Sequence, residues 1–138
     1  MQPRVMVVGS GAREHALLWK LSQSPHCPKL FTAPGNGGTS QIAINLDVTY
    51  EQRRELRELA LQHRIDLAVI SPERALANGL ADVLREAGIS VFGPSKKAAS
   101  IETSKNQACK DMEDAEILHP HTEIFFTTKM ALSYLNSS

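Results

Sequence analysis

The sequence predicts an α/β protein in which helices cover a four-stranded, mainly parallel sheet. Short apolar runs that end in turns alternate with segments whose apolar residues recur at helical spacing. This alternation calls for parallel strands joined by right-handed crossovers. The chain has 138 residues, of which 42% are hydrophobic, so we expect about one domain's worth of core.

The first strand and helix are predicted near the N-terminal end. Residues 5–8 are all apolar and precede a glycine, as in a strand buried on both faces of a sheet. A helix is predicted over 13–24; its apolar residues, Trp19 among them, leave few polar faces, so we expect it to be well buried. A second strand is predicted over 29–33, and the glycine-rich segment 34–39 predicts a loop.

Two more strand and helix pairs follow. Thr49 and Gln52 have the spacing of a capping box, which predicts a helix beginning at Thr49. The third strand is predicted over 67–70, the next helix over 75–87 and the fourth strand over 90–92.

The character of the sequence changes after the fourth strand. Helices are predicted over 105–114 and 129–135, with a strand over 124–126 between them, and these elements have little apolar surface to pack on. We therefore expect a first domain over 1–102 and the truncated start of a second domain over 103–138. The apolar strand could also pair with a second copy, because unpaired edges invite such contacts.

Composition and charge argue against several classes of protein. Lys plus Arg and Asp plus Glu are 15 each, for a formal net charge of +0, which disfavours a nucleic-acid surface built on positive charge. There is no run of 18 apolar residues for a membrane span and no signal-peptide pattern. Cys27 and Cys109 are too few and too far apart for a disulfide framework, which favours a reduced, cytoplasmic protein.

Four loops are predicted to meet at the carboxyl edge of the sheet, where open α/β sheets bind ligands. They are 9–15, 34–39, 71–74 and 93–96, and glycines in three of them would let main-chain N–H groups approach a ligand. The first loop opens a helix, whose N-terminus stabilises anions, and residues 15–46 contain no Asp or Glu. These features favour a phosphate-binding edge.

A dinucleotide site is the first alternative. Gly9 and Gly11 fit the G-x-G-x-x-G fingerprint, but Glu14 replaces the third glycine and the second predicted strand ends without an acidic residue. An NAD-binding domain is therefore disfavoured.

Structural explanations for the same residues also remain open. The two glycines could simply make a tight turn, and 13–15 could form an exposed, self-paired first turn of a helix. Glu73 suits a ligand-facing acid and an ordinary first-turn acid equally well. His119 and His121 lack Cys or acidic partners, so we predict no metal site.

Several motifs at this spacing together resemble one family of ligases. They are 9–16 (G-S-G-A-R-E-H-A), 34–39 (P-G-N-G-G-T), 71–73 (S-P-E), 91–96 (V-F-G-P-S-K) and 102–105 (E-T-S-K). They resemble the N-terminal part of glycinamide ribonucleotide synthetase, also called phosphoribosylamine–glycine ligase. The resemblance covers the whole chain and is strongest up to Lys105.

The resemblance implies a Rossmann-like domain that precedes an ATP-grasp fold, with strand order 2-1-3-4. It implies a purine-biosynthesis ligase that uses ATP and Mg²⁺ (or Mn²⁺) to join glycine, as an acyl phosphate, to 5-phosphoribosylamine. The N-terminal domain would bind the phosphoribosyl substrate, and the ATP-grasp portion would bind ATP and metal. We expect this chain alone to hold no cofactor and to contain no catalytic residue.

The resemblance also implies where the substrate lies. Main-chain N–H groups of 10–13 would hold its phosphate, and Glu14 or Glu73 would accept hydrogen bonds from ribose hydroxyls or the amine. Lys105 matches a family position near the ATP site. The implied substrate-binding residues are Gly9, Ser10, Gly11, Arg13, Glu14, Asn36, Gly38, Thr39, Pro72 and Glu73.

The sequence also departs from the family pattern. Ser71 replaces a glycine, Arg74 follows the glutamate in place of the family's usual residues, and 113–121 fits poorly. Members of the family continue well beyond this length, so we expect a fragment or a shortened frame that is not a competent ligase alone. A stand-alone phosphate- or nucleotide-binding module is the alternative.

Overall fold

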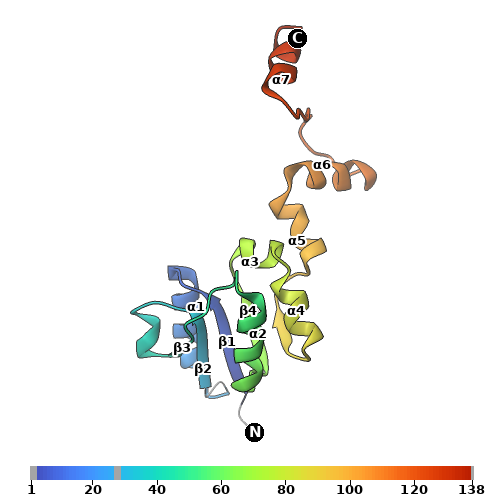
Figure 1. The fold of residues 1–138 in the computed structure, drawn as a ribbon. Coiled ribbons are helices and arrows are strands. Elements are labelled where there is room, and N and C mark those ends of the chain that lie inside the picture. Colours follow the sequence, from blue (N-terminus) through green and yellow to red (C-terminus); the bar gives the residue numbers. More distant parts are fainter. Residues whose placement is uncertain (1–2, 27–28, 138) are drawn as a thin grey trace. The chain divides into compact units, whose positions relative to one another are not determined.

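The computed structural model describes residues 3–26 and 29–137 (Figure 1). The chain divides into two compact units, the first ending at Thr103 and the second beginning at Ser104. The first unit is an α/β domain with a parallel sheet, which confirms the predicted fold class. Cys27 lies outside the described residues, so the structure does not bear on its state.

One parallel sheet of five strands, in the order β3-β2-β1-β4-β5, forms the centre of the first unit. The strands are β1 (Arg4–Gly9), β2 (Lys29–Pro34), β3 (Ile44–Asn45), β4 (Leu67–Ile70) and β5 (Ser90–Phe92). The four predicted strands are present in the expected relative order, but the predicted number of strands is wrong because β3 was not predicted. This edge strand is two exposed residues long and pairs with Phe31 and Thr32, so no apolar run marks it in the sequence.

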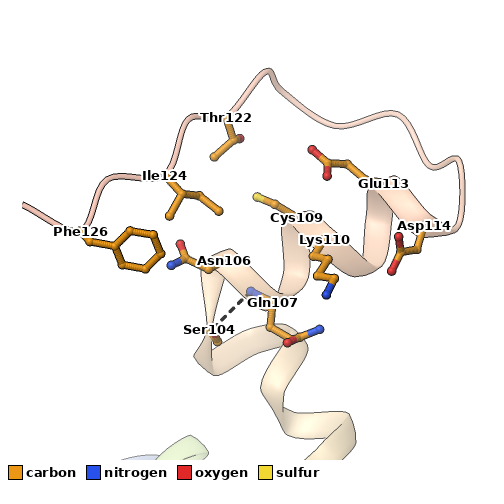
Figure 2. Close-up of a pocket in the computed structure, with 10 residues that line it drawn as sticks. All are labelled: Ser104, Asn106, Gln107, Cys109, Lys110, Glu113, Asp114, Thr122, Ile124 and Phe126. Atoms are coloured by element: carbon orange, nitrogen blue, oxygen red, sulfur yellow. Dashed lines mark hydrogen bonds between the residues drawn. The ribbon is translucent and has the colours of Figure 1, made fainter. Parts of the chain in front are cut away.

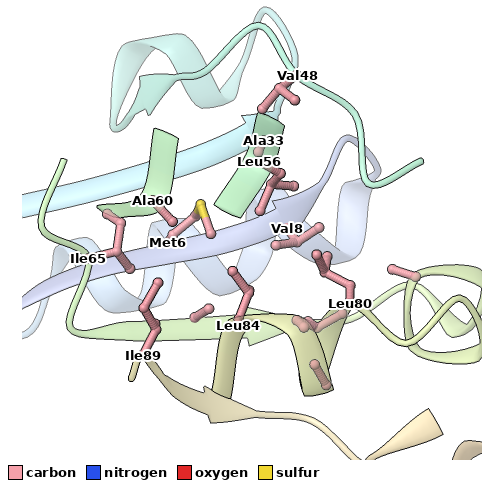
Figure 3. Close-up of a cluster of buried hydrophobic side chains, with 14 of the residues drawn as sticks. Met6, Val8, Ala33, Val48, Leu56, Ala60, Ile65, Leu80, Leu84 and Ile89 are labelled. Atoms are coloured by element: carbon pink, nitrogen blue, oxygen red, sulfur yellow. The ribbon is translucent and has the colours of Figure 1, made fainter. Parts of the chain in front are cut away.

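Helices cover both faces of the sheet. The larger core lies on one face, where Met6 and Val8 are fully buried against residues of α2 and α4 (Figure 3). Phe31 and Ala68 belong to the same core and are also fully buried. On the other face, Val5 and Val7 pack against Leu18 of α1. The helical segments of this unit are α1 (Ala12–Ser22), the 3-10 turn η1 (Thr39–Gln41), α2 (Arg53–Gln62), α3 (Glu73–Ala77), α4 (Leu80–Glu86) and α5 (Lys96–Thr103).

The expectation that the first helix is well buried is wrong. Only Glu14 and Leu18 of α1 are buried, whereas Leu17 is 39% exposed and Trp19, expected in the core, is 56% exposed. The helix rests on the sheet with one side, and within the described part of its unit no further layer covers its outer side.

Two predicted helix boundaries are also wrong. The helix expected to be capped by Thr49 begins at Arg53, with Gln52 as its N-cap residue. The Thr49 N–H and hydroxyl both donate to the Gln52 Oε1, at 3.3 and 3.4 Å, but residues 49–52 form a turn that precedes the helix. The helix expected over 75–87 is two helices, α3 and α4, separated where Gly79 adopts φ +80°. That left-handed conformation suits glycine and interrupts the helical path.

The second unit contains α6 (Lys105–Asp114) and α7 (Thr128–Leu135), close to the predicted helices. The strand predicted over 124–126 is wrong: this segment has no regular structure, and every strand of the described chain belongs to the sheet of the first unit. Its apolar pattern lacks a neighbouring strand that could supply hydrogen bonds. Among the helices that the structure describes, none combines the length and apolar character needed to cross a membrane.

Candidate functional site

Three of the four loops predicted to share the carboxyl edge are joined to one another there. The Gly35 N–H donates to the Gly9 carbonyl, 3.1 Å away, and links the loop after β2 to the end of β1. The Arg13 guanidinium lies 3.2 Å from a Glu73 carboxylate oxygen and links the start of α1 to the loop after β4. The predicted grouping therefore rests on direct contacts for the loops 9–15, 34–39 and 71–74, and these contacts do not include the loop 93–96.

The loop between β1 and α1 differs from its predicted form at Glu14. This side chain was expected to face a ligand, yet the residue is only 4% exposed. Its Oε2 atom accepts a hydrogen bond of 2.7 Å from the Gly11 N–H. The Gly11 N–H is therefore already engaged, and a phosphate at this corner would meet the N–H groups of Ser10, Ala12 and Arg13 instead.

Arg13 is an exposed cation of this corner. It sits in the first turn of α1, where the first N–H groups of a helix have no partner within the helix, and its side chain is 67% exposed. The neighbouring Glu73 carboxylate raises the pKa of Arg13, so the guanidinium stays positive. Arg13 can therefore offer a cation and several N–H donors to an anionic ligand.

The loop after β2 is held together by its own side chains. The Asn36 Oδ1 atom accepts from the N–H groups of Gly38 (2.8 Å) and Thr39 (3.0 Å), and the Asn36 Nδ2 donates to the Ser10 carbonyl at 2.8 Å. The Thr39 hydroxyl bonds within the same loop and is buried. Asn36 and Thr39 thus shape the edge with the polar groups that were expected to touch a ligand.

Asn45 is a member of this network that sequence reasoning missed. Its Nδ2 donates to the Asn36 carbonyl at 2.9 Å, and its Oδ1 accepts from the Thr39 hydroxyl at 3.0 Å. Asn45 reaches the loop because it belongs to the short edge strand β3. Only the pairing of that strand could have indicated its role.

Pro72 and Glu73 lie where the loop after β4 turns into a helix. Pro72 is the N-cap residue of α3 and Glu73 its first residue, so Glu73 is both a first-turn acid and a neighbour of the ligand edge. A hydrogen bond from its own N–H, followed by the Arg13 guanidinium, lowers the pKa of Glu73.

We expect Glu73→Gln to lower the melting temperature of the chain slightly, by an amount that depends on pH. Because the pKa of Glu73 is lowered in the folded chain, its contribution is present above the ordinary value of 4.5 and is lost as the pH falls through the folded value. Melting temperatures of both chains between pH 3 and pH 7 should therefore differ slightly at pH 7, and the difference should shrink as the pH falls below 4.5. A difference that does not change with pH would contradict the ion pair.

A separate cavity of about 580 Å³ lies within the second unit, between α6 and the extended segment that follows it (Figure 2). Cys109 and Lys110 line it from the helix, and Ile124 and Phe126 from the extended segment. Lys105, the residue matched to an ATP site, is exposed at the start of α6 and is not among the lining residues. This cavity therefore gives no geometric support to the ATP prediction.

Metal-ligating residues are scattered over the described parts of the chain. Residues 3–26 and 29–137 contain no group of three or more His, Cys, Asp or Glu side chains that could hold a metal ion. His119 and His121 instead lie near single acids, Glu113 at 3.9 Å and Glu123 at 3.2 Å respectively.

Comparisons of sequence connect this chain to known proteins. The family described as "Phosphoribosylglycinamide synthetase, N domain" matches residues 3–102. The phosphoribosylamine–glycine ligase of Caldanaerobacter subterraneus subsp. tengcongensis is 42% identical over 135 residues, 98% of this chain and 32% of that protein. The ligase of Mycobacterium leprae is 48% identical over 121 residues, 88% of this chain and 29% of that protein. The chain thus spans about a third of the length of these relatives.

Solved structures show the same fold. The crystal structure of phosphoribosylamine–glycine ligase from Thermotoga maritima superposes with a TM-score of 0.73 at 27% identity, over 97% of this chain and 30% of that one. The biotin carboxylase domain of a single-chain bacterial carboxylase also superposes with a TM-score of 0.73, over 98% of this chain and 34% of that one. Its 14% identity shows likeness of fold alone.

Proposed function

The chain belongs to the phosphoribosylglycinamide synthetase N-domain family, and on that premise we propose that it forms the phosphoribosyl-binding part of a ligase. The whole enzyme would join glycine to 5-phosphoribosylamine in purine biosynthesis, in the cytoplasm. ATP, with Mg²⁺ or Mn²⁺, would supply the phosphoryl group that activates glycine as an acyl phosphate. The partner of this chain is then a small anionic sugar.

One observation carries the proposal. Arg13, at the N-terminus of the 11-residue helix α1, lies 3.2 Å from Glu73 on the neighbouring loop, so a cation and an acid stand together on the ligand edge. A phosphoribosyl group has one end that needs a cation and N–H donors, and a ring whose hydroxyls need acceptors. The two side chains suit the two ends of such a ligand.

In this proposal, different residues contact different parts of the substrate. Arg13 and the N–H groups of Ser10 and Ala12 bind the phosphate, which the helix N-terminus also favours. Glu73, 44% exposed, accepts hydrogen bonds from ribose hydroxyls or the amine. Gly9, Gly11, Asn36, Gly38, Thr39 and Pro72 shape the loops around them.

We test the proposal by calorimetric titration of the 138-residue chain with ribose 5-phosphate, ATP and NAD in turn. Ribose 5-phosphate should bind, since it carries the phosphate and ring hydroxyls of the proposed substrate. ATP and NAD should bind at least tenfold more weakly. Tight NAD binding without a response to ribose 5-phosphate would instead support a dinucleotide domain.

We also propose that the chain alone does not catalyse the ligase reaction. The chain spans about a third of the length of the ligases that it matches, and Lys105 is its one residue matched to an ATP site. A mixture of the chain with glycine, ATP, Mg²⁺ and 5-phosphoribosylamine should therefore release no ADP above background. Steady turnover in that assay would refute the proposal.

A further inference from the structure

Glu14 is a buried acid beneath the loop that joins β1 to α1. Its Oε2 atom accepts the 2.7 Å hydrogen bond from the Gly11 N–H, while its Oε1 atom is buried and has no hydrogen-bond partner among the described residues. The residue is 4% exposed, although it lies in the first turn of a helix that opens at the ligand edge. Its side chain is thus directed under the loop instead of toward solvent.

The two glycines of this loop leave the space that Glu14 fills. A Cβ atom on Gly9 would lie 2.7 Å from the Glu14 Cγ, and a Cβ atom on Gly11 would lie 2.9 Å from the Glu14 Oε2. Both distances are below 3.0 Å, so a Cβ atom at either position would force Glu14 to shift. At position 11 the crowded atom is the end of the Glu14 side chain, and its shift would disturb the hydrogen bond from the Gly11 N–H.

At Gly11, unlike at Gly9, the backbone conformation does not itself require glycine, so the space for Glu14 can be tested separately there. Gly9 has φ +129°, which disfavours other residues whatever the space, but Gly11 has φ −87° and ψ −178°, an extended conformation that any residue adopts. Gly11 is also the N-cap residue of α1, a position where serine is at least as favourable as glycine. The Glu14 Oε2 is the one close contact that a Cβ atom at position 11 would meet among the described residues, so this contact is the reason to expect harm from a side chain there.

We infer that Glu14 is a positioning residue. Its carboxylate supports the loop from the buried side through the hydrogen bond from the Gly11 N–H, an arrangement called the brace below, and the glycines leave space for this carboxylate, not for a ligand. The consequence for stability is independent of the ligand. The consequence for binding rests on the proposed function, because the braced loop presents the N–H groups of Ser10 and Ala12 and fixes the start of the helix that carries Arg13.

The unpartnered Oε1 atom makes glutamine the informative replacement. In Glu14→Gln the amide oxygen can still accept from the Gly11 N–H, while the amide nitrogen places N–H donors where the described residues show no hydrogen-bond partner, which costs stability but leaves the bond to Gly11 in place. The brace therefore survives in Glu14→Gln and is lost in Glu14→Ala. A carboxylate that bound substrate hydroxyls directly would be impaired by both changes.

The first experiment measures melting temperatures in a double-mutant cycle on the 138-residue chain. Gly11→Ser should lower the melting temperature by about 4–8 °C in the unsubstituted chain, equivalent to roughly 1 kcal/mol. It should do the same in Glu14→Gln, but leave it unchanged or raise it in Glu14→Ala, where the carboxylate is gone and serine caps the helix. Equal losses in all three backgrounds would overturn the inference. If Glu14→Ala does not fold, the inference is overturned when Gly11→Ser leaves the melting temperatures of the unsubstituted and Glu14→Gln chains unchanged.

The second experiment titrates ribose 5-phosphate into the same variants. Glu14→Gln should bind within about twofold of the unsubstituted chain, whereas Glu14→Ala should bind roughly tenfold more weakly, the factor that 1.4 kcal/mol represents. Equal weakening by both variants would assign Glu14 to direct substrate contact and overturn the inference. If the unsubstituted chain does not bind ribose 5-phosphate, the proposed function fails, and the melting-temperature cycle still decides whether Glu14 is the brace.

Discussion

Phe31→Ala should lower the free energy of unfolding of the first unit by about 3–5 kcal/mol, the usual cost of truncating a fully buried aromatic side chain. Phe31 lies in β2, next to the central strand β1, and its residue exposure is 0%. Its ring contacts His63 at the end of α2, with ring centroids 5.2 Å apart. Because domains of this size are stable by about 5–15 kcal/mol, the loss would be a large share of the total.

Urea unfolding followed by circular dichroism measures this effect, and Phe92→Ala is the matched control. Phe92 has the same side chain in another strand of the same sheet, β5, but is 72% exposed. Its truncation should change the free energy of unfolding by less than about 0.5 kcal/mol. Similar losses in the two variants would mean that the core is not arranged around Phe31.

Arg13→Ala should raise the Kd for ribose 5-phosphate by roughly 10- to 100-fold. A hydrogen bond to a charged group contributes about 1.5–3 kcal/mol, and Arg13 is the cation that the proposed site aims at the phosphate. The melting temperature should hardly change, because the side chain is 67% exposed and its ion pair with Glu73 is open to solvent.

The control for this variant removes a positive charge elsewhere in the same unit. Arg57 in α2 is also solvent-accessible and pairs with its neighbour Glu58. Arg57→Ala should change the Kd for ribose 5-phosphate by less than about twofold if binding is local, since exposed charges farther apart than about 10 Å are screened at 0.1 M salt. Equal affinity of Arg13→Ala and the unsubstituted chain would remove Arg13 from the site.

Much of the fold could be predicted because its two central strands, β1 and β4, are largely buried. Residues 5–8 and 67–70 are short apolar runs, and they form the neighbouring strands β1 and β4 at the centre of the sheet. Strand β3 could not be predicted, because its two residues are exposed and depend entirely on pairing with β2. The same limit applies to 124–126, where an apolar run has no strand beside it.

Helix ends and helix faces were less predictable because they depend on tertiary contacts. The interruption at Gly79 is a single backbone conformation inside a continuous helical pattern. The exposure of Trp19 reflects how few elements cover α1, which its apolar composition does not reveal.

The candidate site, too, could be predicted only in part. Parallel strands end at a common edge, so the meeting of Arg13 with Glu73 follows from the order of elements. Whether a polar side chain turns outward or inward depends on local hydrogen bonds. Glu14 turns toward the Gly11 N–H, and Asn36 toward the N–H groups of Gly38 and Thr39, so both serve the loops themselves.

The Asn36 amide that reaches the Ser10 carbonyl has a thermodynamic consequence for recognition. Because this cross-link orders both segments as the polypeptide folds, the conformational entropy of arranging them is already lost before any sugar arrives. Such preorganisation leaves more of the contact energy to appear as affinity. If the proposed sugar binds at this corner, we expect its affinity to depend partly on the Asn36 amide, which bonds the Ser10 carbonyl.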